Sequence, residues 1–299
     1  MRILITADLH YENPRSRPSA RAVAARICGE GGDVLILGGD TFAVDLSILK
    51  ECLALFDDFR GTKLLVVGNH CLWVLEEGDS FRRYTEEIPE VAEKAGWHVL
   101  DRSPVVIGSV GFVGSVGWYD YKFRDPNLKV PERFYAAKIG PGTARFLERY
   151  FPLLENQSDL LPWHFSIRSR WMDSEYIRWR FTDQEFAAYT AQRLEAHLKQ
   201  IAPHVETIVA VTHHVPLEEM VRRKENDPSW NFANAFQGSP LLGEVLKKEA
   251  KVKYIVCGHV HKPQELQLDG RRAWNVGSGI RRKRIVLIDT EKPDGRLLD

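Results

Sequence analysis

The sequence lacks an apolar run long enough to cross a membrane, and it lacks an excess of charge of either sign. With 41 basic and 41 acidic residues, the formal net charge is zero, so the chain has no global field of the kind that suits nucleic acid or an anionic membrane. The first expected strand begins at Arg2, which leaves no room for a signal peptide. We therefore expect a soluble, cytoplasmic protein with no membrane partner.

Cysteine is scarce as well. The four cysteines are scattered without a C-x-x-C spacing, which excludes a disulfide framework and a zinc ribbon. No internal repeat or low-complexity tract is present. A chain of 299 residues is long enough for one large domain or two modest ones with a sizeable core.

Polar residues of a restricted kind follow five apolar runs. The runs cover residues 3–6, 34–37, 63–67, 208–211 and 254–257, and each is typical of a buried strand. The residues that follow them are Asp8, His10, Asp40, Asn69, His213, His259 and His261. Ligand sites of open α/β sheets form beyond the carboxyl ends of strands, so we expect these side chains to converge.

The residue types indicate a metal site. Asp8 and His10, like His259 and His261, are two residues apart, so each pair points to the same side of an extended segment. Oxygen and imidazole ligands without thiolate suit Mn, Fe, Zn, Co or Ni. Taken singly, Asp8 or Asp40 is better explained as a helix N-cap, and the histidines could be hydrogen-bonded loop residues. Taken together, the set would be costly to gather without a function.

The ordered motifs Ala7-Asp8-Leu9-His10, Gly38-Gly39-Asp40, Gly68-Asn69-His70, Thr212-His213-His214 and Gly258-His259-Val260-His261 carry a family resemblance. The sequence resembles the calcineurin-like metallophosphoesterase superfamily over about residues 2–289, except for a stretch from about 118 to 181. The resemblance implies an α/β fold, an α/β/β/α sandwich of two mixed β-sheets flanked by helices.

The resemblance also implies a dinuclear centre of two divalent or trivalent transition-metal ions. One ion would be held by Asp8, His10 and His261, the other by Asn69, His213 and His259, with Asp40 bridging them. A hydroxide shared by the ions would be the nucleophile. His214 is an alternative to His213 if the strand ends one residue later, but the family places the ligand first in such pairs.

The family counterpart of His70 faces the substrate and assists the leaving oxygen, so the resemblance makes His70 the catalytic residue. The alternative is a hydrogen-bonded loop histidine. The family usually has Asp or Glu at the next position, where this chain has Cys71. A neutral thiol would favour protonated His70 less, unless another carboxylate substitutes in space.

Strands and helices alternate through residues 1–113, which is α/β order. Helices are expected over residues 19–28, 46–59, 81–95, 182–201 and 240–250, and further strands over 97–100, 105–107, 111–113, 264–268, 272–275 and 284–288. Residues 118–181 are rich in aromatics and proline, so we expect few long helices there except over 143–150. We interpret the chain as a single domain over 1–299 with an insertion or cap at about 118–181 that shapes substrate choice.

The sequence therefore predicts a metal-dependent phosphoester hydrolase, either a phosphatase or a phosphodiesterase. Its substrate would be a phosphorylated small molecule, a nucleotide or a phosphoprotein. Nucleic acid is disfavoured by the neutral charge, and the basic run at residues 281–284 is typical of a solvated turn. The alternative function is a non-catalytic scaffold of the same fold for protein binding. Candidate substrate contacts, each equally consistent with a structural role, are Tyr11, Arg15, Arg17, Trp118, Trp230, Asn231 and Phe236.

Overall fold

The computed structural model describes residues 1–292 and 294–299, which build two six-stranded sheets. The first sheet has the order β12 (Asp294–Leu298), β11 (Ile285–Asp289), β1 (Arg2–Thr6), β2 (Val34–Gly38), β3 (Thr62–Val66) and β4 (His98–Val99). The second has the order β5 (Val105–Ile107), β6 (Val110–Ser115), β7 (Thr207–Thr212), β8 (Val252–Cys257), β10 (Arg271–Asn275) and β9 (Gln264–Leu268). The first sheet is parallel from β1 to β4 and antiparallel at its β11–β12 edge, and the second is parallel at its centre and antiparallel at both edges, so both are mixed, as predicted.

The two sheets share an apolar core. Ile5 and Ile36 of the first sheet belong to the same buried cluster as Val209, Val256 and Trp274 of the second. The central parallel strands are covered on both faces, which explains why their sequences are nearly continuous apolar runs instead of alternating ones.

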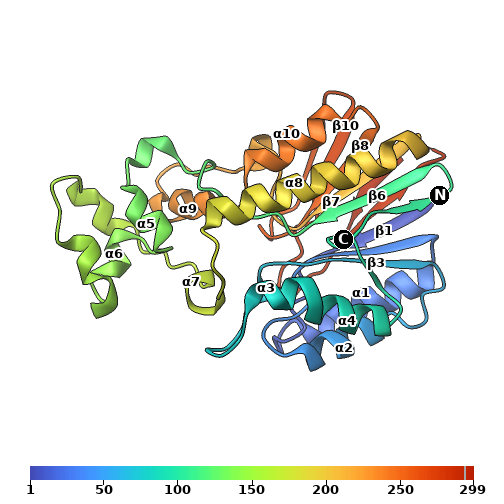
Figure 1. Ribbon diagram of the computed structural model, residues 1–299, viewed down its shortest axis with the longest axis horizontal. Helices are drawn as coiled ribbons and strands as arrows, with labels where there is room; N and C mark the ends of the chain where they lie inside the picture. Colours follow the sequence, from blue (N-terminus) through green and yellow to red (C-terminus); the bar gives the residue numbers. More distant parts are fainter. Residues whose placement is uncertain (293) are drawn as a thin grey trace.

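Helices cover the outer face of each sheet (Figure 1). Those on the first sheet are α1 (Arg17–Glu30), α2 (Leu46–Ala54) and α4 (Ile88–Lys94), and those on the second are α8 (Asp183–Ile201) and α10 (Pro240–Lys248). Helix α8 begins at a capping box in which the Thr182 hydroxyl accepts from the Glu185 backbone N–H and the Glu185 carboxylate accepts from that of Thr182. The α/β/β/α sandwich is therefore confirmed.

Residues 118–181 contain only short helices and project from one end of the sandwich together with α9 (Pro228–Ala233) (Figure 1). These helices are η3 (Pro126–Leu128), α5 (Glu132–Ala136), α6 (Pro141–Ala144), η4 (Glu148–Leu154), η5 (Pro162–Ser166) and α7 (Asp173–Tyr176). The helix predicted over 143–150 is wrong, because the chain leaves α6 after one turn and re-forms only as the 3₁₀ segment η4. Trp118 and Tyr119 join the buried cluster that packs on the first sheet.

Other elements differ from expectation. The helix predicted over 81–95 is divided into α3 (Ser80–Arg82), the π-helical segment η2 (Arg83–Glu87) and α4. Strand β12 and α9 were not expected, and neither were the short turns η1 (His70–Leu72), η6 (Ala202–His204), η7 (Glu218–Met220) and η8 (Asn234–Phe236). In the part of the chain that the structure describes, none of the helices has the length and apolar character to cross a membrane.

Candidate metal centre

The carboxyl ends of five strands from both sheets meet at one site. The ligand atoms of Asp8, His10 and His261 lie within 4.8 Å of one another, and so do those of Asp40, His213 and His259. Asn69 joins the second group, since its Oδ1 is 3.1 Å from His213 Nε2 and 3.1 Å from His259 Nδ1. The structure thus brings together all seven residues that the sequence singled out.

The backbone carries these ligands in an unusual conformation. Five of the seven have positive φ angles, namely Asp8 (56°), His10 (44°), Asp40 (49°), His259 (71°) and His261 (56°). The left-handed region costs a non-glycine residue roughly 1 kcal/mol or more, and such outliers concentrate at functional sites. Gly39 also has a positive φ, of 95°. Glycine is needed at this position for a further reason, because a Cβ there would collide with the His213 ring.

Asp40 lies between the two groups. Its Oδ1 accepts a hydrogen bond from the His70 backbone N–H at 2.9 Å, which fixes the carboxylate. Its Oδ2 is 3.6 Å from His10 Nε2 and 3.4 Å from His213 Nε2. One oxygen therefore faces both ligand groups, which is the position that a bridging carboxylate requires.

In the second group, hydrogen bonds on the side away from the centre determine whether the atoms that face the centre are donors or acceptors. His213 Nδ1 donates to the Gly38 carbonyl at 3.0 Å, and His259 Nε2 donates to the Phe236 carbonyl at 3.1 Å. A carbonyl only accepts, so in the neutral rings the inner nitrogens are left with lone pairs. Asn69 Nδ2 donates to Asp173 Oδ1 at 2.9 Å, which directs the Asn69 carbonyl oxygen inward in the same way.

The inner atoms of the site lie close to one another. His259 Nδ1 and His213 Nε2 are 3.3 Å apart, and His10 Nε2 and His261 Nε2 are 3.2 Å apart. Asp8 Oδ2 is buried without a hydrogen-bond partner among the described residues. In their neutral forms these rings direct lone pairs toward the same space, so the residues present fit a pair of metal ions that would displace the protons.

The charges of the buried groups lead to the same conclusion. Burial alone would raise the pKa of Asp8, but the adjacent His261 and His213 outweigh it and hold this pKa at about 2. His213, His70 and His10 likewise hold the pKa of Asp40 well below its usual range against the effect of burial. Asp40 also overcomes burial at His213 and raises its pKa to about 9. Without a metal ion, the proton on His213 places a positive charge beside Asp40.

His70 lies at the edge of the centre. Its ring stacks on the Trp73 ring with the centroids 3.7 Å apart. It meets the His10 ring edge to face, with the centroids 4.7 Å apart. Burial lowers the pKa of His70, while Asp40 and Asp173 act in the opposite direction.

Cys71 points away from His70. Its Sγ lies 3.6 Å from Thr41 Oγ1 inside the core, and burial raises the pKa of this thiol to about 11. The carboxylates near His70 thus come from other segments.

Asp173 is the residue that sequence reasoning missed most clearly. It is buried, and its oxygens accept hydrogen bonds from Asn69, Trp73, Tyr119 and Trp171. No motif marks it, because it lies in the insertion about a hundred positions from its partner Asn69. The insertion was expected to shape substrate choice alone, yet Asp173 makes it part of the support of the metal centre.

Two further groups also escaped notice. Glu12 Oε1 lies 3.2 Å from His10 Nδ1 and fixes that ring from outside. Lys283 is buried and donates to the Asp8 carbonyl oxygen at 2.5 Å, so one residue of the basic run at 281–284 supports the site instead of lying in a solvated turn. A lysine directed inward beside arginines that face Asp299 gives no signal in sequence.

A cavity of about 290 Å³ opens beside the centre and is lined by Asp40, His70, Trp171, Trp230, Ala233, Gln237, His259, Val260 and His261. Of the candidate substrate contacts, Trp230 is in this list. Trp118 is not, since it is fully buried and its Nε1 donates to Asp183. His214 is also buried and turns its Nδ1 to the Val116 carbonyl at 2.8 Å, while His213 lies in the group with Asp40 and His259.

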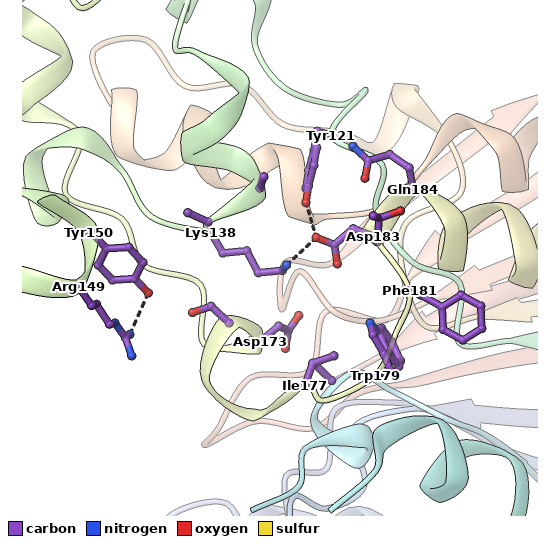
Figure 2. A pocket seen from close by; sticks show the side chains of 14 residues that line it. Tyr121, Lys138, Arg149, Tyr150, Asp173, Ile177, Trp179, Phe181, Asp183 and Gln184 are labelled. Carbon is purple, nitrogen blue, oxygen red and sulfur yellow. Dashed lines mark hydrogen bonds and ion pairs between the residues drawn. The ribbon is translucent and has the colours of Figure 1, made fainter. Parts of the chain in front are cut away.

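A second cavity, of about 560 Å³, lies between residues 118–181 and the start of α8 (Figure 2). Asp173 forms part of its wall, so this carboxylate separates the second cavity from Asn69. The polar groups in it are paired with one another: Tyr121 and Lys138 both donate to Asp183, and Arg149 donates to Tyr150 (Figure 2). These polar side chains therefore already have hydrogen-bond partners within the cavity wall.

Two mixed sheets flanked by helices form the metallophosphoesterase fold. The chain belongs to the calcineurin-like phosphoesterase family, whose model matches residues 1–263. A comparison with curated protein sequences gave no match.

Solved structures share the fold at low sequence identity. The phosphopantetheinyl hydrolase of Mycobacterium tuberculosis has a TM-score of 0.65 and 17% identity, covering 92% of this chain and 88% of that one. The protein TT1561 of Thermus thermophilus has a TM-score of 0.56 and 12% identity, covering 99% and 97%. A dimetal phosphatase from Danio rerio has a TM-score of 0.53 and 13% identity, covering 100% and 98%.

Proposed function

We propose that this chain hydrolyses phosphoesters at a dinuclear metal centre. The observation that carries the proposal is the position of Asp40 Oδ2, which faces His10 Nε2 at 3.6 Å and His213 Nε2 at 3.4 Å. Asp8, His10 and His261 would hold one ion, and Asn69, His213 and His259 the other. The names of two similar structures, a phosphopantetheinyl hydrolase and a dimetal phosphatase, are consistent with this chemistry.

When bound, two such ions would supply Lewis-acid stabilisation of a phosphoryl group and a water of lowered pKa. The chain itself supplies the remaining functions. Asp40 and Asp8 keep their negative charge, and the outer hydrogen bonds of His213 and His259 hold the rings in place. His70, fixed by its stack on Trp73, lies in the cavity wall, where we propose that it donates a proton to the leaving oxygen.

The size of the cavity favours small organic phosphoesters as substrates. Its volume of about 290 Å³ suits a phosphate with an organic group of modest size. We further propose that residues 1–299 form one domain with 118–181 as an insertion, and that the protein acts in the cytoplasm.

Metal analysis combined with two aryl substrates tests the function. We expect up to two transition-metal ions per chain and metal-dependent release of nitrophenol from p-nitrophenyl phosphate, from bis(p-nitrophenyl) phosphate, or from both. The preferred ester identifies a phosphatase or a phosphodiesterase. A protein that binds two ions but turns over neither ester would favour the scaffold alternative.

A further inference from the structure

The cavity beside the metal centre is lined by residues of two chemical kinds. Asp40, His70, His259 and His261 belong to the centre or its edge. The remaining lining residues are uncharged, namely Trp171, Trp230, Ala233, Gln237 and Val260, and the Trp171 ring lies 5.5 Å from that of His259. An organic group attached to a phosphate held at the metal centre would therefore meet aromatic and aliphatic surface with a single amide.

Hydrogen bonds fix the orientation of that amide. Gln237 Nε2 donates to Asn234 Oδ1 at 2.6 Å, and Asn234 Nδ2 donates to the Arg222 carbonyl at 3.2 Å. Because the Arg222 carbonyl only accepts, Asn234 must direct its NH₂ toward it and its oxygen toward Gln237. Flipping the Gln237 amide would then place two oxygens against each other. Gln237 is consequently an acceptor on its free side.

This acceptor has no donor. Gln237 is 6% exposed, and its Oε1 is buried without a hydrogen-bond partner among residues 1–292 and 294–299. A buried carbonyl left unpaired is unfavourable, and sites built to hydrogen-bond a substrate group discriminate strongly against analogues that lack it. Gln237 also lines the cavity, so a small shift of its amide would let a donor on the ligand reach this oxygen and relieve the deficit.

The aromatic residues nearby are anchored by the same segment. Trp230 Nε1 donates at 2.6 Å to the Arg222 carbonyl, the one that also orders Asn234. Trp171 stacks on Phe236 with the centroids 5.4 Å apart, and its Nε1 donates to Asp173. The two indoles are therefore held in position before a ligand enters, which reduces the entropy lost on binding.

We propose that Gln237 determines substrate specificity by accepting a hydrogen bond from an N–H group on the organic part of the phosphoester, with Trp171 and Trp230 packing against the apolar atoms around it. The substrate class is accordingly an organic phosphoester with an amide or heterocyclic N–H. This inference rests on the proposed phosphoester hydrolysis.

Matched substrate pairs test the inference. One pair is 2-acetamidoethyl phosphate and its N-methyl analogue, and the other is thymidine 5′-phosphate and its 3-N-methyl analogue. The members of each pair differ only in whether the N–H is present, and comparing the two pairs shows whether the enzyme prefers an amide N–H or a nucleobase N–H.

We expect kcat/KM to be at least about tenfold higher for the N–H member of one pair, mainly through a lower KM. In Gln237→Met this ratio should fall toward one, whereas in the control Gln200→Met, on the exposed face of α8, it should equal that of the parent.

The outcomes separate the two proposals. If the parent hydrolyses aryl phosphates but does not distinguish either pair, the N–H inference is wrong and the hydrolase function stands, with water as the partner of Gln237. A preference that persists in folded Gln237→Met also overturns the inference. If this variant does not fold, the ratios of the parent alone decide. Absence of hydrolysis of every ester, aryl esters included, in metal-loaded protein overturns both proposals.

Discussion

At the scale of single residues, Asp40 has the most exacting position in the centre. One of its oxygens is held by the His70 backbone and the other faces a histidine of each ligand group. Such a carboxylate has to offset the charge of two cations at once, whereas His10 contacts a single ligand group besides Asp40. The two residues are therefore expected to respond differently to substitution.

We predict that Asp40→Asn lowers kcat at least about a hundredfold and weakens both ions, because an amide oxygen carries no charge to share. His10→Ala should be milder and affect mainly one ion. Metal content by mass spectrometry and turnover of an aryl phosphate measure both effects, with Asp57→Asn on the exposed surface as the control. Two tightly bound ions and normal turnover in Asp40→Asn would show that the bridging assignment is wrong.

At the scale of elements, the insertion supports the centre in addition to bordering it. Tyr176 of α7 stacks on Trp73, which in turn stacks on His70, and Asp173 at the start of α7 holds the Asn69 amide. A helix of four residues is thus connected to a candidate metal ligand on one side and to the residue proposed as proton donor on the other.

We predict that Asp173→Asn weakens the second ion about tenfold to a hundredfold, because removing the outer partner of a ligand lets that ligand rotate. Metal titration by calorimetry measures the effect, and activity at saturating metal should recover in part. Asp159→Asn, which removes an exposed ion pair with Arg133 in the same insertion, should leave the affinity unchanged. Equal affinity in the two variants would show that Asp173 does not position Asn69.

Helix α8 contains a separate pH-sensitive group. Burial, assisted by Arg193, lowers the pKa of His197 from 6.5 to about 4. Between these values the unfolded chain binds the proton and the folded chain does not, so stability is lost as the pH falls through this window. Between pH 7 and 4.5 the parent should lose about 2 kcal/mol more than His197→Gln.

Urea unfolding of both proteins at a series of pH values measures this difference. Other groups titrate in the same range, but they cancel in the comparison of parent and variant. His204→Gln, at an exposed position, is the matched control and should follow the parent. Parallel stability curves for parent and His197→Gln would contradict the prediction.

The elements also show what could be predicted from sequence. The central strands were found because burial on both faces leaves a continuous apolar run, and the seven candidate ligands because each follows such a run closely in the chain. Asp173, Glu12 and Gln237 were not found, since their positions depend on contacts between distant segments. The π-helical segment η2 was missed because its sequence suits an ordinary helix equally well.

At the scale of the whole molecule, the centre joins the two sheets. Its ligands follow β1, β2 and β3 of one sheet and β7 and β8 of the other. A cation held by both groups would cross-link the layers, in addition to the apolar core between them.

We predict that chelation lowers the melting temperature by about 5 °C or more and that Mn²⁺ or Zn²⁺ restores it, because an ion that binds only the folded state stabilises it by mass action. Scanning fluorimetry with and without chelator measures the shift. Asp40→Asn, with weakened sites, should respond much less. An unchanged melting temperature after verified loss of metal would contradict the cross-link.

The left-handed backbone at five candidate ligands has a consequence for how the protein would evolve. At these positions glycine would adopt the same backbone conformation without strain. The fold therefore gives up some stability in order to place these side chains at the site. In chelator, Asp8→Gly should be more stable than Asp8→Ala by about 1 kcal/mol, the reverse of the usual order, and denaturant titration of the pair measures this. A lineage that no longer needed the ions would gain stability by losing these ligands, and would drift toward glycine at those positions.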